Sequence, residues 1–101
     1  MKIKFLTLNI FNGEFLDKCI DFLKKESPDV FVLQEVYKGG ILELDKKYRS
    51  LEILTRKFGD YDFYYSKAYF IKIGKTKVDS INAIFSRFPM IKNETIFFYH
   101  E

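Results

Sequence analysis

The amino-acid sequence predicts an α/β fold, with α+β character in its later part, that opens with a βαβ unit. A strand-like segment, an amphipathic segment and a second strand-like segment follow one another before residue 37. Aromatic residues, which favour strands, make up 19% of the 101 residues. The hydrophobic fraction is 48% and the charged fraction 31%, a balance that is typical of one small globular domain.

The βαβ unit is built from three segments in order. Residues 2–10 (KIKFLTLNI) alternate apolar and polar side chains as a strand does. Residues 14–26 (EFLDKCIDFLKKE) have apolar side chains at helical spacing, with acids at the start and lysines at the end. Ser27-Pro28 ends this helix. Residues 30–36 (VFVLQEV) form a short continuous apolar run, which is typical of a strand in a parallel sheet.

Two polar residues, Asn9 and Glu35, stand near the carboxyl ends of these strands. Parallel strands joined by a helix end at the same sheet edge, where α/β folds bind ligands. A carboxylate there suits Mg²⁺, which takes oxygen ligands, but Glu35 could equally be a solvated strand tip. The Asn9 amide could orient a phosphate or cap the following turn. The residues alone leave these alternatives open.

The rest of the chain predicts one more helix and several strands. Residues 48–58 (YRSLEILTRKF) show helical spacing, and the segments from residue 61 to residue 100 are rich in aromatic and β-branched residues. The stretch 64–77 (YYSKAYFIKIGKTK) mixes aromatics with lysines, as platforms for single-stranded nucleic acid do. We expect instead an ordinary hairpin, with Tyr69, Ile71 and Ile73 facing the core and the lysines facing water.

Composition bears on the partners of the protein, on its single cysteine and on its location. The net charge of +3 is compatible with a phosphate-bearing partner and does not require one. The lone cysteine, Cys19, excludes a disulfide within the chain and fits a helix-core position. No apolar run is long enough to span a membrane, and no signal peptide is recognisable, so we expect a cytoplasmic protein.

Three blocks of sequence together resemble the endonuclease/exonuclease/phosphatase family, which has the deoxyribonuclease I-like fold: TLNIFNG at 7–13, DVFVLQEV at 29–36 and NAIFSRFPM at 82–90. The resemblance implies the N-terminal part of a four-layer αββα sandwich and a Mg²⁺-dependent phosphoesterase, with Mn²⁺ as a substitute ion. It also implies that Glu35 is the metal ligand and that Asn9 is the catalytic-site amide. Just before the third block, Ile81 stands where the family often has Gly, which a strand tolerates.

The family's later motifs are absent from this sequence. Neither a Gly-Asp-x-Asn block nor a Ser-Asp-His block occurs, and the single histidine, His100, has no such context. We therefore expect residues 1–101 to form one incomplete domain of this family, a fragment with little hydrolase activity of its own. Its partners would be a phosphoester substrate, with nucleic acid among the candidates, and copies of itself through exposed apolar surface. The alternative is a non-catalytic α/β module that binds a phosphate or a protein at the same sheet edge.

Overall fold

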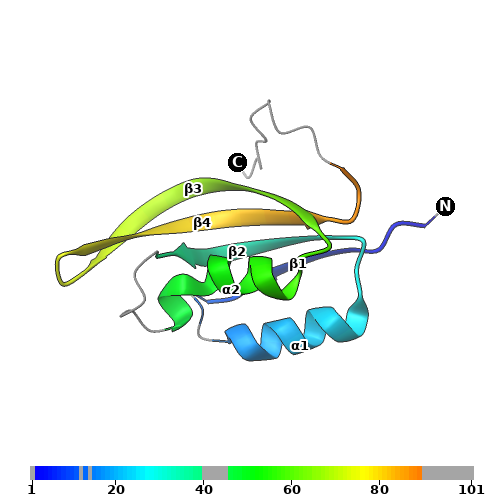
Figure 1. Ribbon diagram of the computed structural model, residues 1–101, viewed down its shortest axis with the longest axis horizontal. Helices are drawn as coiled ribbons and strands as arrows, with labels where there is room; N and C mark the ends of the chain where they lie inside the picture. The colour runs from blue at the N-terminus through cyan, green and yellow to red at the C-terminus, as the bar shows by residue number, and fades with distance from the viewer. Residues whose placement is uncertain (1, 12, 14, 40–45, 90–101) are drawn as a thin grey trace.

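A computed structural model describes residues 2–11, 13, 15–39 and 46–89. These residues form a four-stranded sheet in the order β1-β2-β4-β3, with two α-helices and a 3₁₀ turn (Figure 1). The elements are β1 (Phe5–Asn9), α1 (Leu16–Glu26), β2 (Val30–Lys38), η1 (Lys46–Arg49), α2 (Ser50–Lys57), β3 (Asp62–Ile73) and β4 (Thr76–Ser86). The predicted mixed α/β class is confirmed.

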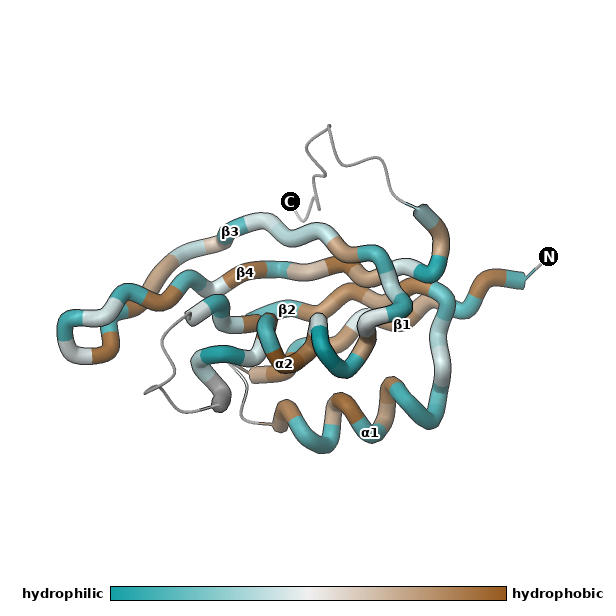
Figure 2. The backbone as a smooth tube through the Cα atoms, viewed as in Figure 1, coloured by the Kyte–Doolittle hydropathy of each residue, from teal (hydrophilic) through white to brown (hydrophobic). Residues whose placement is uncertain are grey.

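Both helices lie on the same face of the sheet (Figure 1), and the hydrophobic core fills the space between the helices and the sheet. Phe31 of β2 is at its centre: its ring stacks on Phe85 of β4 and meets Phe58 and Tyr61 edge-on. Leu23 of α1 is fully buried in the same cluster. Apolar residues at helical spacing therefore face apolar residues of the strands, and this burial is the main force that holds the fold. Figure 2 shows the brown apolar stretches of both helices among teal polar ones.

The opening βαβ unit is confirmed, because β1 and β2 pair in parallel on either side of α1. The two strands do not end together, however. Their pairing stops at Asn9 and Gln34, while β2 continues to Lys38 by pairing antiparallel with β4. Glu35 therefore lies within a strand and not at its tip, although it still stands at the carboxyl edge of β1.

The β3–β4 hairpin is longer than the core beneath it and reaches past the helices (Figure 1). Its turn is at Gly74, which has a φ of 63°. Tyr69, which we expected to face the core, is 47% exposed, and Ile71 and Ile73 are half-buried. No helix covers this end of the hairpin among the residues that the structure describes. The last of the strand-like segments between residues 61 and 100, residues 94–100 with His100, lies outside the described residues.

Cys19 is buried in the core cluster, as its helical position predicts. Burial raises the pKa of its thiol to about 11. Among the described residues, no helix is both long and apolar enough to cross a membrane.

Candidate metal and phosphate site

Asn9 and Glu35 are in direct contact. The Asn9 side-chain amide donates a hydrogen bond from Nδ2 to Oε2 of Glu35 over 2.8 Å. Asn9 is exposed and Glu35 is half-buried, so the pair is accessible from solvent. Two residues that are 26 positions apart in the chain are thus joined at the edge where β1 ends.

A β-bulge in β2 brings Glu35 to this position. Leu33 pairs with Ala83, but the next pair is Val36 with Ile81, so two residues of β2 oppose one residue of β4. Leu33 and Val36 both remain in the core, and the extra residue lets Glu35 leave the alternating pattern that would otherwise send its charge toward the helices.

The backbone of Glu35 is in the left-handed region, with a φ of 60°. A side chain with a Cβ is unfavourable there by about 1–2 kcal/mol, and bulges of this type normally use glycine. Such outliers persist where the surroundings hold them, and they cluster at functional sites. We therefore interpret the glutamate at this unfavourable backbone position as a functional residue.

The Asn9 amide is fixed at both ends. Its Oδ1 accepts a hydrogen bond from the backbone N–H of Phe11 over 2.7 Å, which closes a local turn after β1. Nδ2 must then be the atom that faces Glu35, and it keeps a second N–H for another acceptor. Asn9 therefore caps the turn after β1, which is one of the two alternatives that its sequence position left open, and it also presents a donor beside the Glu35 carboxylate.

The segment after Glu35 is held by Ser50, the first residue of α2. Its buried Oγ accepts a hydrogen bond from the N–H of Tyr37 over 2.9 Å and donates one to the C=O of Tyr37 over 3.4 Å. These backbone groups lie on the side of β2 where β1 has already ended, so Ser50 supplies the hydrogen bonds that a paired strand would otherwise make. Burial raises the pKa of the Tyr37 hydroxyl, with smaller contributions from Tyr69, Tyr48 and Glu35.

The oxygens available for a cation come from one carboxylate. Within the described part of the chain, only Asn9 donates a hydrogen bond to Glu35, which leaves Oε1 open. The same residues contain no group of three or more His, Cys, Asp or Glu side chains that could hold a metal ion. A cation here would take one protein carboxylate and fill its shell with water and phosphate oxygens, which is a donor set that suits Mg²⁺.

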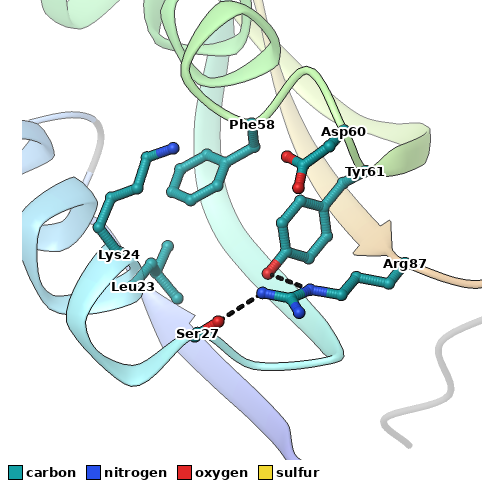
Figure 3. Close-up of a pocket in the computed structure, with 7 residues that line it drawn as sticks. All are labelled: Leu23, Lys24, Ser27, Phe58, Asp60, Tyr61 and Arg87. Carbon is teal, nitrogen blue, oxygen red and sulfur yellow. Dashed lines mark hydrogen bonds between the residues drawn. The ribbon is translucent and has the colours of Figure 1, made fainter.

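A second polar cluster has a structural role (Figure 3). Arg87, which follows β4, donates a hydrogen bond from Nε to the hydroxyl of Tyr61 over 3.1 Å and another from Nη2 to Oγ of Ser27. The Tyr61 hydroxyl in turn donates to the C=O of Pro28 over 2.6 Å. The adjacent cavity is only about 70 Å³. These contacts tie the loop between α1 and β2 to the sheet, so Arg87 has a packing role.

The comparisons with known proteins support the fold. No family model matches the chain, and no curated protein matches it in sequence. A solved structure, an endonuclease/exonuclease/phosphatase family protein from Leptotrichia buccalis C-1013-b, is similar with a TM-score of 0.57 and 24% identity. The match covers 89% of this chain and 40% of that protein. The chain thus has a fold similar to part of that structure and spans less than half of its length.

Proposed function

We propose that this chain carries the metal-anchoring part of a metal-dependent phosphoester hydrolase. The observation that carries the proposal is the contact between Asn9 and Glu35, with the carboxylate held in a left-handed backbone conformation at a bulge. The fold similarity to an endonuclease/exonuclease/phosphatase family protein supports the reaction class. Residues 1–101 would form the N-terminal portion of such a domain.

The roles of the two residues follow from their chemistry. Glu35 would hold Mg²⁺, or Mn²⁺ in its place, through the oxygen that Asn9 leaves open. When bound, the ion would supply a positive charge that polarises a phosphoryl oxygen. Asn9 would orient the Glu35 carboxylate with one N–H and offer its second N–H to a phosphate oxygen. Asn9 has no basic group and the Glu35 carboxylate would be occupied by the ion, so the general base would be a different residue.

Binding of inorganic phosphate with and without Mg²⁺, measured by calorimetry, tests the proposal. Glu35→Gln should abolish the Mg²⁺-dependent component, and Asn9→Ala should weaken it about 10- to 100-fold, as is usual for partners of metal ligands. Glu26→Gln is the matched control, because that carboxylate pairs with Lys4 on the surface. Equal effects of Glu35→Gln and Glu26→Gln would overturn the metal role.

A non-catalytic binding module is the second candidate function, because the site beside Asn9 offers a single carboxylate and the described residues contain no group of three or more metal-binding side chains. The Glu35→Ala variant distinguishes the two candidates. A binding module would keep its affinity for phosphate or for a protein partner in this variant, with or without Mg²⁺. The hydrolase proposal requires that the Mg²⁺-dependent binding disappears. It also predicts that the chain alone turns over phosphodiesters poorly, because a general base typically contributes about 10²–10⁴-fold in rate.

A further inference from the structure

The outer part of the β3–β4 hairpin, from Ser66 to Ser80, has an excess of positive charge. We call this segment the arm. It contains Lys67, Lys72, Lys75 and Lys77 against a single acid, Asp79. The arm therefore has a net charge of +3, which equals the net charge of the whole protein. The charges of the remaining residues cancel in total, so the arm accounts for the net positive charge that would attract a polyanion.

Exposed aromatic rings lie among these lysines. Phe70 is 47% exposed, and the ammonium groups of Lys67 and Lys77 lie 5.4 and 4.5 Å from the centre of its ring. The arrangement is repeated nearer the core, where Lys38 lies 5.8 Å from the ring centre of Tyr65, which is 36% exposed. Each unit thus combines an aromatic ring with at least one cation.

The two units share one face of the sheet. Asp79 pairs with both Lys38 and Phe70, and Tyr65 pairs with Ala83 of the core, so the strand register sets these side chains on the face that the helices cover further along. Tyr65 and Phe70 are separated by about 15 Å along β3. Lys38 and Tyr65 also line a groove of about 530 Å³ between the sheet and α2.

The charge pattern on this face favours a polyanion over a protein or a bilayer. Lys72 and Lys77 are direct cross-strand partners, and like charges in that arrangement are unfavourable without a ligand between them. Residues 74 and 75, at the tip, are glycine and lysine, so the arm has no apolar end to insert into lipid. The aromatic rings lie along the stem instead, as a linear ligand requires.

We propose that the arm binds single-stranded nucleic acid along this face. Bases would stack on the Phe70 and Tyr65 rings while the lysines neutralise the flanking phosphates, which is the pairing of groups that such strands recognise. The inference goes beyond the proposed function, because it requires neither a metal ion nor Glu35. The hairpin and the exposure of its lysines agree with the sequence-based expectation, which did not include exposed rings between the lysines.

Fluorescence anisotropy with a labelled oligothymidylate of about 15 nucleotides, in EDTA, tests the proposal with two variants. Phe70→Leu keeps the apolar bulk and should weaken binding about fivefold or more. The pair Lys72→Gln and Lys77→Gln removes a repulsive contact, so the fold should tolerate it. This pair should reduce the slope of log affinity against log salt by about 1.4, at roughly 0.7 per phosphate. The pair Lys18→Gln and Lys25→Gln on α1 is the charge-matched control.

Two competitors separate the other ligands. Inorganic polyphosphate has the charge without the bases, and vesicles that contain phosphatidylserine offer an anionic lipid surface. We expect Phe70→Leu to weaken oligonucleotide binding and to leave polyphosphate binding unchanged. The proposal is overturned if Phe70→Leu affects neither ligand, if the α1 control pair is as damaging as the arm pair, or if the arm variants change vesicle binding alone.

Discussion

Replacing Glu35 by glycine and by alanine measures the backbone strain at the site. At a φ of 60°, alanine is unfavourable by about 1–2 kcal/mol, whereas glycine is not. Glycine in a strand is destabilising by about 0.5–1 kcal/mol relative to alanine, through the entropy of the unfolded chain. The difference predicts that Glu35→Gly is more stable than Glu35→Ala by roughly 0.75 kcal/mol, within a range of about 0–1.5 kcal/mol. Both variants lack the carboxylate, so its loss cancels from the comparison.

The neighbouring residue, Gln34, is the control. It has an ordinary negative φ and pairs with Asn9 in the parallel ladder. Gln34→Gly should therefore be less stable than Gln34→Ala by about 0.5–1 kcal/mol, and the sign of the glycine–alanine difference should reverse between the two positions. Urea denaturation followed by far-UV circular dichroism gives all four free energies of unfolding. The same sign at positions 34 and 35 would refute the argument that Glu35 is strained.

Three further predictions concern the rest of the chain. Ser50→Ala should lower the free energy of unfolding by about 1–3 kcal/mol in the same denaturation assay, because it leaves the backbone groups of Tyr37 unpaired. The control variant Ser66→Ala, at a half-buried serine, should change this free energy little. The pKa of about 11 for Cys19 predicts about 100-fold slower alkylation of the thiol at pH 8 in the folded protein than in urea, and equal rates would contradict its burial. The free energy of unfolding should be independent of this thiol below about pH 9 and should fall as the pH rises toward 11. Because Phe5 is 56% exposed on the sheet face opposite the helices, light scattering should show concentration-dependent self-association that Phe5→Ser reduces, and a monomer at high concentration would argue against it.

The contact between Asn9 and Glu35 could be anticipated because it depends on local signals. Apolar periodicity indicates the strand, the helix and the second strand, and parallel pairing then places the end of β1 beside residues 34 and 35 of β2. The bulge could not be anticipated in the same way. A glycine at position 35 would have indicated a left-handed residue, but glutamate gives no such signal, and the register shift depends on pairing with β4, about 50 residues away in sequence.

The sequence pattern does not predict the exposed face of the arm, for a related reason. A second bulge, between Lys67 and Tyr69 of β3, shifts the alternation by one residue, and such a shift moves every later side chain to the other face. The sequence pattern also does not indicate where the helices stop covering the sheet. The length of the hairpin beyond them depends on tertiary packing, which periodicity within one segment does not report.

Paramagnetic broadening of backbone amide signals by Mn²⁺ is the most direct test of the metal-anchoring role of Glu35. The method detects weak binding and locates it, which suits a site with a single protein carboxylate. Substoichiometric Mn²⁺ should broaden the signals of Phe11, Gln34 and Val36 first, and Glu35→Gln should remove this selectivity while Glu26→Gln leaves it intact. Broadening that is spread over the surface acids, or that persists around residue 35 in Glu35→Gln, would contradict the account.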